Sequence, residues 1–186
     1  MTNACSGPSK AGSLMLGVMS YSMIELRAFI DTDVDSIAKY ANNFNVSRYM
    51  ASRMPYPYTK EDAKWWVEIG SKELGHNKAI DLDGECIGVI GVRFGESELQ
   101  YSAEIGYWLA EDHWGKGIGT EAVLSMTDNV FSDTEIVRLC APVFNPNKAS
   151  MRVLEKCGYT LEAIHRKAVF KNNEFMDEHV FVKFRS

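Results

Sequence analysis

The spacing of apolar residues changes several times along the chain and separates predicted strands from predicted helices. Apolar and polar residues alternate over 24–28, which is the pattern of a half-buried strand. Apolar residues then recur at helical spacing over 34–41 and again over 59–74, which predicts two helices. Thr59 and Asp62 make a capping-box-like pair at the start of the second. The segment 44–58 between them is aromatic-rich and contains two prolines, so we expect a long connection there.

From residue 76 onward the period of the pattern falls to two, as in a sheet. Segments 76–82 and 85–94 are predicted strands joined by a hairpin turn at Asp83-Gly84, and 100–109 is a third strand. The remaining segments predict a helix over 119–131, a strand over 136–143, a short helix over 146–157 closed by Gly158, and a hairpin formed by 159–170 and 175–184. This order of elements indicates a mixed α/β domain.

The length of 186 residues suits one domain with a single substantial core, and no repeat or linker divides the chain. Residues 1–20 are rich in small residues without a pattern, so we expect a flexible tail before a domain spanning 21–186. The apolar run at 14–19 is too short for a membrane span. We therefore expect no membrane partner.

Charge and cysteine content exclude several classes of site. The formal net charge of −5 argues against a general nucleic-acid binder, which would carry a clustered basic excess. The four cysteines are far apart, so neither a disulfide framework nor a zinc site is expected, and a reducing, cytoplasmic compartment fits. We interpret Cys86, Cys140 and Cys157 as small buried hydrophobes. Neither His113 nor His165 has a partner at metal-ligand spacing, so no metal site is expected.

The segment His113–Ala122, HWGKGIGTEA, is the most informative in the chain. Its three glycines alternate between a predicted strand and a predicted helix. Glycine allows a positive φ and lets a ligand approach the backbone, and the following helix presents unpaired N–H groups to an anion. The segment therefore indicates a phosphate-binding loop, although a glycine-rich turn without a ligand has the same composition. The nucleotide loop G-x-x-x-x-G-K-[ST] and the dinucleotide pattern G-x-G-x-x-G are both absent.

Three segments together resemble the GNAT superfamily of acetyl-CoA-dependent N-acetyltransferases, and more narrowly its RimJ/RimL-like branch. They are the strand 104–109, the glycine loop with its helix, and a second helix that opens with NPNKAS at 145–150 and ends with KCGY at 156–159. The resemblance implies a single mixed, mostly antiparallel central sheet, flanked by helices and splayed at the cofactor strand. It also implies acetyl-CoA as co-substrate and a protein or peptide N-terminal amine as acceptor.

The same resemblance implies where acetyl-CoA binds. The glycine loop would hold the pyrophosphate, and an open strand edge would pair with the pantetheine amides, with a bulge at Gly106 opening that edge. The family loop has glutamine or arginine three residues before its central glycine, where this chain has Trp114. The implied cofactor-binding residues are Tyr107, Trp108, Leu109, Trp114, Gly115, Lys116, Gly117, Ile118, Gly119, Thr120, Asn147 and Ser150.

Two residues are candidates for the catalytic roles. Glu104 occupies the position of the family's general base, and an α-amine with a reference pKa of about 7.7–8.0 needs only modest help to lose its proton. The alternative is an exposed strand glutamate paired with a cation. Leu154 stands where many members have an acidic tyrosine, so Ser150 is the nearest candidate acid. Ser150 and Asn147 could equally be ordinary helix-capping groups.

The acceptor is the least defined part of the prediction. By resemblance, the segment 44–58 and the hairpin loop near Asn172 would line the acceptor groove. Trp65 and Trp66 are interpreted as core, and Arg166, Asp177 and His179 as structural cross-strand groups. A small amine, such as a polyamine, an amino sugar or an amino acid, remains an alternative acceptor. A non-catalytic acyl-CoA-binding module remains another, and the chain could be a monomer or a homodimer.

Overall fold

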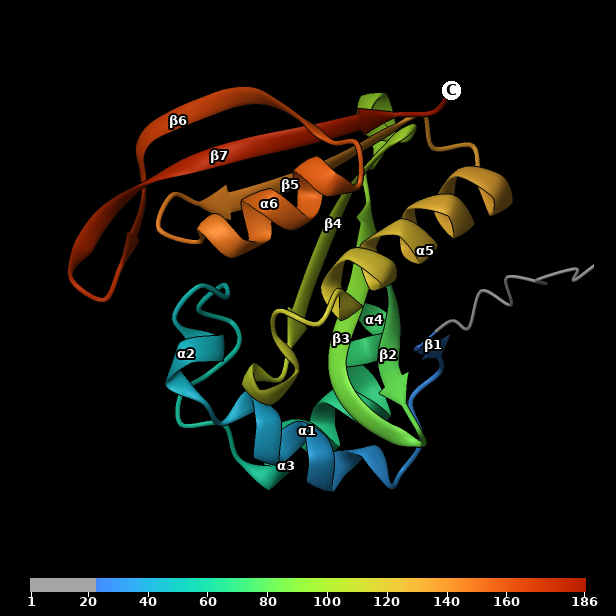
Figure 1. Cartoon of the computed structure of the whole chain (residues 1–186), viewed down its shortest axis with the longest axis vertical. Coiled ribbons are helices and arrows are strands. Elements are labelled where there is room, and N and C mark those ends of the chain that lie inside the picture. The colour runs from blue at the N-terminus through green and yellow to red at the C-terminus, as the bar shows by residue number, and fades with distance from the viewer. Residues whose placement is uncertain (1–22) are drawn as a thin grey trace, which may run out of the picture.

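The computed structural model describes residues 23–186, which fold around one mixed sheet (Figure 1). In the described chain the sheet has seven strands in the order β1-β2-β3-β4-β5-β7-β6, and β4–β5 is its parallel pair. The strands are β1 (Glu25–Arg27), β2 (His76–Leu82), β3 (Glu85–Phe94), β4 (Ser102–Leu109), β5 (Arg138–Phe144), β6 (Thr160–Lys171) and β7 (Glu174–Phe184). The predicted mixed, mostly antiparallel sheet is confirmed. The predicted tail, 1–20, lies outside the described residues.

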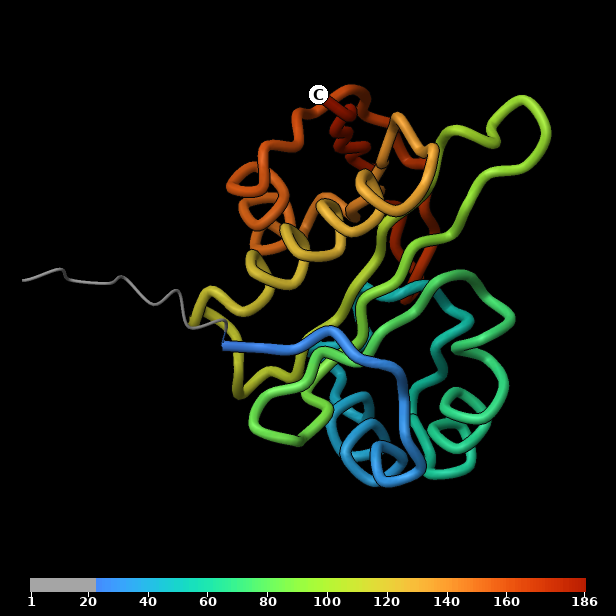
Figure 2. Tube along the Cα trace, turned by 90° about the vertical axis from the view of Figure 1, so that its right-hand side faces the viewer, coloured from blue at the N-terminus to red at the C-terminus, as the bar shows by residue number. Residues whose placement is uncertain are grey.

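Helices cover both faces of this sheet. Figure 2 shows α5 and α6 on one side of the central strands and the helices of the first half of the domain on the other. The segments are α1 (Asp33–Ala41), α2 (Phe44–Ser47), α3 (Lys60–Trp65), the π-helical η1 (Trp66–Gly70), α4 (Ser71–Glu73), the 3₁₀ turns η2 (Ser97–Leu99) and η3 (Glu111–His113), α5 (Ile118–Asp133) and α6 (Lys148–Lys156). The helix predicted over 59–74 is confirmed as the run α3–η1–α4. The predicted connection 44–58 contains the short α2.

Each face of the sheet has its own hydrophobic core, because strand side chains alternate between faces. Ala103, Ile105 and Leu109 of β4 join the core under α5 and α6. Trp108 belongs to the other core, under α1 and α3, together with Val89 of β3. Successive side chains of β4 therefore lie on opposite faces of the sheet, one under α5 and α6 and the other under α1 and α3.

Local sequence signals fix the turns between these elements. Asp83 and Gly84 have φ of 54° and 89°, and Asn172 and Asn173 have φ of 53° and 61°. Left-handed residues in two-residue loops match the twist of antiparallel strands, so both predicted hairpins form. Thr59 makes the predicted capping box with Asp62 at the start of α3.

The sheet opens between β4 and β5 (Figure 1). These parallel strands pair only from Ser102–Arg138 to Glu104–Cys140 and then diverge, so the later half of β4 has no β5 partner. The register of β4 with β3 runs without a shift through Gly106. The predicted splay is therefore present, but the predicted bulge at Gly106 is wrong, since the edge opens where the parallel pairing stops.

Candidate active site

The glycine loop ends in an uncapped helix N-terminus. Gly115 and Gly117 have φ of 74° and 87°, and Gly117 is the N-cap of α5. No side chain makes a capping hydrogen bond there, and a Cβ at either glycine would meet nothing within 4 Å. The first N–H groups of α5 therefore face open space, which suits a phosphate group. This geometry fits the pyrophosphate of coenzyme A.

The residues around this loop divide between exposed and packed positions. Trp114 is 41% exposed, and its Nε1 donates to the carbonyl of Leu109 at 2.8 Å, which ties the loop to the end of β4. Ile118 is buried in the core, so only its backbone is available to a ligand. A Cβ at Gly119 would lie 3.8 Å from Val153 of α6, in ordinary contact. Lys116 is exposed and Thr120 is half-buried.

A pair of hydroxyl groups bridges the gap between β4 and α6. The Tyr107 hydroxyl lies 2.9 Å from Ser150 Oγ, and either oxygen can be the donor. Burial raises the pKa of Tyr107 to about 12, so this phenol stays protonated at neutral pH. Asn147 Oδ1 accepts from the Ser150 backbone N–H at 3.2 Å, so the capping role of Asn147 is confirmed. Leu154 is fully buried and faces the core.

Glu104 stands at the point where the sheet opens. It forms the last residue pair between β4 and β5, and its side chain is 34% exposed. Arg93 lies directly across from it on β3, with Nη2 2.9 Å from Glu104 Oε2. The alternative of a strand glutamate paired with a cation is therefore confirmed as geometry. The ion pair engages Oε2, one of the two oxygens of the Glu104 carboxylate.

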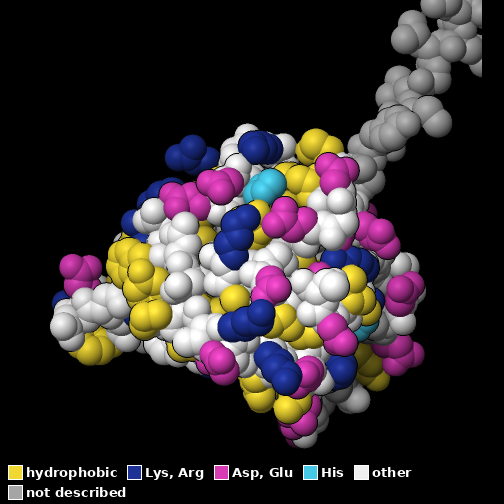
Figure 3. Space-filling view, turned by 90° about the horizontal axis from the view of Figure 1, so that it is seen from below, with side chains coloured by type: hydrophobic (Ala, Val, Ile, Leu, Met, Phe, Trp, Pro, Cys, Tyr) yellow, Lys and Arg dark blue, Asp and Glu magenta, His cyan; other side chains and the backbone are white. Residues whose placement is uncertain are grey.

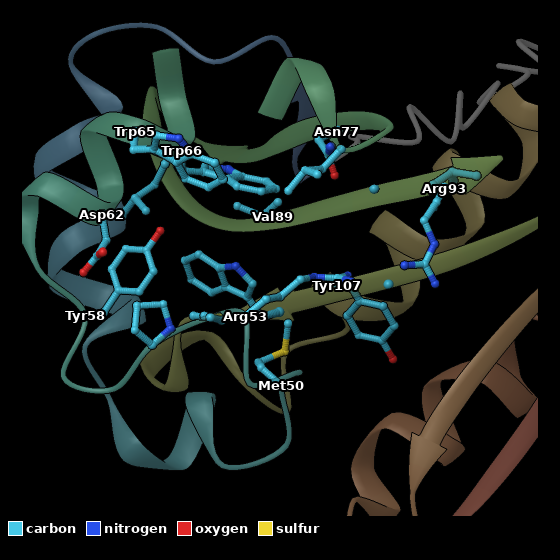
Figure 4. Close-up of a pocket in the computed structure, with 18 of the residues that line it drawn as sticks. Met50, Arg53, Tyr58, Asp62, Trp65, Trp66, Asn77, Val89, Arg93 and Tyr107 are labelled. Carbon is cyan, nitrogen blue, oxygen red and sulfur yellow. The ribbon is translucent and has the colours of Figure 1, made fainter. Parts of the chain in front are cut away.

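Beside Glu104 lies a cavity of about 360 Å³ on the α1/α3 face of the sheet (Figure 4). Glu104, Gly106 and Trp108 alternate along β4 and line its floor. Tyr107 also lines the cavity, while its hydroxyl reaches Ser150 on the α6 side. The gap between β4 and β5 therefore lies between the cavity on the α1/α3 face and the Tyr107–Ser150 pair on the α6 side.

The tryptophans of the α3–η1 segment form part of the cavity wall. Trp65 is 47% exposed and lines the cavity, so the interpretation of Trp65 as core is wrong. Trp66 is half-buried, packs against the core and also lines the cavity. The π-helical turn changes the helical register at this point, and such turns are frequent at functional sites.

The predicted acceptor segment 44–58 closes the cavity from below in Figure 4, through Met50 and Arg53. The final hairpin is attached to it, because Lys171 Nζ donates to the carbonyls of Ser47, at 3.1 Å, and Met50. Burial lowers the pKa of this ammonium. The expected convergence of segment 44–58 and the hairpin is therefore present at Lys171.

A second tie joins the same segment to the approach to the glycine loop. The amides of Asn43 and Asn45 donate to the Glu111 carboxylate at 2.8 to 3.1 Å. The hydrogen bonds from these two amides are the main reason that the pKa of Glu111 is lowered. The start of the acceptor segment and the loop before α5 are thus held together by one carboxylate.

Two of the remaining polar candidates, on the final hairpin, are structural partners of each other. Arg166 pairs with Asp177 at 2.6 Å across the final hairpin, as predicted. Cys86 and Cys157 are buried and Cys140 is half-buried, and burial raises the pKa of each thiol. In the described part of the chain, no three His, Cys, Asp or Glu residues come together as metal ligands. None of the helices described has the length and apolar character of a membrane span.

Sequence reasoning missed three features of the site. The first is Arg93, which pairs with Glu104, and the second is Gly91, which lies opposite Gly106. The third is the hydroxyl of Tyr107, which contacts Ser150. The pairing register between the strands predicted over 85–94 and 100–109 would have identified the first two features. The seven residues between β3 and β4 do not define that register. The Tyr107 contact depends on packing between β4 and α6, which no local pattern reports.

Comparisons with known proteins agree on the fold and the family. A family model described as an acetyltransferase (GNAT) domain matches residues 24–160. The ribosomal-protein-serine acetyltransferase of Escherichia coli is 32% identical over 129 residues, which are 67% of this chain and 72% of that protein.

Solved structures show the same fold at lower identity. A GNAT-family acetyltransferase from Bacillus anthracis superposes with a TM-score of 0.78 at 23% identity, covering 88% of this chain and 95% of that one. RimL, a ribosomal L7/L12 α-N-protein acetyltransferase in complex with coenzyme A, superposes with a TM-score of 0.74 at 21% identity. The match covers 88% of this chain and 94% of that one. Spermidine N-acetyltransferase from Vibrio cholerae, in complex with coenzyme A and spermine, superposes with a TM-score of 0.73 at 20% identity. The match covers 88% of this chain and 96% of that one.

Proposed function

The chain belongs to the GNAT acetyltransferase family, in its RimJ/RimL-like branch, and is an acetyl-CoA-dependent N-acetyltransferase; we propose that it transfers the acetyl group to the α-amine of a protein or peptide. The observation that carries this proposal is the arrangement about the open edge of β4. A carboxylate, Glu104, faces one side of that edge, and a hydroxyl pair, Tyr107 and Ser150, faces the other.

Acetyl-CoA supplies the acetyl group as a thioester, and the chain holds it through backbone groups. The free N–H groups at the start of α5 bind the pyrophosphate, and the unpaired edge of β4 from Ile105 to Leu109 binds the pantetheine amides. A backbone N–H at this edge donates to the thioester carbonyl as negative charge develops on its oxygen. Such a donor is worth roughly 2.7–4 kcal/mol in other enzymes.

Glu104 accepts the proton that the amine must lose, directly or through one water. An α-amine with a pKa of about 7.7–8.0 is already partly neutral at pH 7, so a carboxylate suffices, whereas a lysine at about 10.4 would need a stronger base. The neutral nitrogen attacks the acetyl carbon, forming a C–N bond while the C–S bond breaks. Arg93 holds the other carboxylate oxygen and fixes the orientation of Glu104.

Ser150 donates its hydroxyl hydrogen to the departing sulfur. Tyr107 passes its own proton to Ser150 Oγ in the same step, and solvent then returns a proton to the phenol, whose raised pKa favours the protonated form. Reaction is direct, in a ternary complex, because the amine and the thioester meet at the opening between β4 and β5. Of the cysteines described, those at 86 and 157 are buried and none lines the cavity, which argues against an acyl-enzyme.

The proposal is tested by measuring thiol release from acetyl-CoA with a panel of amines. We expect acetyl-CoA alone to raise the melting temperature of the protein, since it binds the native state. We expect turnover with short peptides that have a free α-amine, and none with the same peptides blocked at the N-terminus but carrying lysine. Turnover with polyamines or amino sugars and not with peptides would favour a small-amine transferase. Stabilisation without turnover of any amine would favour a non-catalytic acyl-CoA-binding module.

A further inference from the structure

The floor of the acceptor cavity is built from three pairs of residues that face each other across β3 and β4. They are Arg93–Glu104, Gly91–Gly106 and Val89–Trp108. Successive residues on one face of a strand are about 7 Å apart, so the floor runs from an ion pair over a glycine pair to an apolar pair. The end beside Glu104 is charged, and the far end is apolar.

The glycine pair makes a hollow in this floor next to the carboxylate. A Cβ at Gly106 would meet nothing within 4 Å, so the space above it is open. Above Gly91 the space is filled, because a Cβ there would lie 1.9 Å from Asn77 Oδ1. The Asn77 amide is itself fixed, donating to the Ser71 carbonyl at 3.1 Å. The hollow therefore lies over Gly106 and is walled on one side.

Aromatic side chains surround this hollow. Tyr58 is buried, and Figure 4 shows Trp65 and Trp66 lying over the cavity on the side away from Arg53. Trp65 is held in place by contact with the backbone at Gly70, where a Cβ would come within 2.5 Å of its ring. The cavity volume of about 360 Å³ is at the lower end for small-molecule sites, roughly 300–1,000 Å³. It fits one large side chain or ring.

The far end of the cavity holds one carboxylate, and that carboxylate is engaged as a helix cap. Of the described lining residues, the carboxylates are Glu104 and Asp62. Asp62 Oδ2 accepts from the Thr59 N–H at 2.8 Å and from its hydroxyl at 2.7 Å, as the cap of α3. Burial raises the pKa of Tyr58 to about 12, so this phenol is neutral. A second amine at this end would have Asp62 as its one carboxylate among the described lining residues, in competition with the Thr59 cap.

We propose that the cavity selects primary amines that carry a large apolar, preferably aromatic, group one or two carbons from the nitrogen. The ammonium is received by Glu104, and the apolar group lies over Gly106 against Trp65, Trp66 and Trp108. This selection deepens the proposed transfer to α-amines and rests on it. The shared chemistry is found in peptides that begin with phenylalanine or leucine, in free phenylalanine and in phenylethylamine.

The test compares kcat/KM for peptides that differ only in their first residue. We expect the phenylalanine and leucine peptides to exceed the alanine and serine peptides at least roughly tenfold, since each buried methylene is worth about that factor or more. Free phenylalanine and phenylethylamine, run in parallel, separate a peptide acceptor from a small aromatic amine. Spermidine is expected to be the poorest substrate.

Two variants connect the selectivity to the cavity. Gly106→Val fills the hollow, and we expect the ratio of kcat/KM for phenylalanine over alanine peptides to fall at least roughly tenfold. Trp65→Ala should lower the same ratio, whereas Ile69→Ala, in the adjoining η1 and outside the cavity lining, should leave it unchanged. Retained stabilisation by acetyl-CoA verifies that each variant is folded.

Three outcomes overturn the proposal. Preference for serine or alanine peptides would overturn the selectivity while leaving α-amine transfer intact. An unchanged ratio in both Gly106→Val and Trp65→Ala would show that the cavity is not where the apolar group binds. Absence of turnover with every amine would overturn this inference together with the proposed function.

Discussion

Ser150, the proposed acid, is held in place by one residue of its own helix and one of the opposite strand. Asn147 fixes the backbone of Ser150 through the helix cap, and Tyr107 holds its hydroxyl from the opposite strand. Leu154, at the position where a tyrosine acid is common in the family, is instead buried in the core. The phenol that contacts this region thus comes from β4 rather than from α6.

At this scale we expect Ser150→Ala to lower kcat by roughly 10²-fold or more, because general acid catalysis typically contributes 10²–10⁴. The variant keeps the backbone N–H at position 150 that donates to Asn147 Oδ1, so the start of α6 and the affinity for acetyl-CoA should be unchanged. The check is kcat by thiol release beside the dissociation constant by calorimetry. Ser132→Ala, an exposed serine at the end of α5, is the control. Unaltered kcat in Ser150→Ala would remove Ser150 from the mechanism.

At the scale of elements, the start of α5 is shaped by backbone conformation rather than by side-chain contacts. The helix begins at a left-handed glycine, with no side chain across its first N–H groups. A left-handed φ is open to glycine and strained for other residues. The loop therefore needs glycine for its shape, and the shape leaves the N–H groups free for phosphate.

Gly117→Ala is expected to lower the free energy of unfolding by about 1–2 kcal/mol and also to weaken acetyl-CoA binding. Gly84→Ala is a matched control, because Gly84 has φ of 89° and equally open surroundings but lies in the β2–β3 turn. We expect both variants to lose similar stability in urea titrations and only Gly117→Ala to lose affinity. Equal affinity in both variants would place the pyrophosphate elsewhere.

The elements themselves were largely predictable from the sequence, and the site only in part. Alternation, caps and turn residues act locally, which is why the strands from 76 to 94 and the capping box at Thr59 form as expected. Positions set by tertiary packing were not accessible. The exposure of Trp65 depends on a π-helical turn, and the Arg93–Glu104 pair depends on a register across an irregular loop.

For the whole molecule, the decisive feature is the place where the sheet stops pairing. The parallel contact between β4 and β5 ends at Glu104, and the two hydrophobic cores separate the faces on either side. On the face formed by α1 and α3, basic and acidic side chains are interspersed rather than gathered by sign (Figure 3). Specificity on this side is therefore expected from the cavity and not from a long-range field.

The most direct test of this account is the rate of acetyl transfer by Glu104→Gln, measured from pH 6 to pH 9 on one α-amine peptide at saturating acetyl-CoA. We expect a loss of roughly 100-fold or more below pH 7, narrowing as the amine loses its own proton above its pKa of about 7.7–8.0. Glu98→Gln, at an exposed glutamate in the β3–β4 connection, should behave as wild type. Wild-type rates in Glu104→Gln across the whole range would contradict the account.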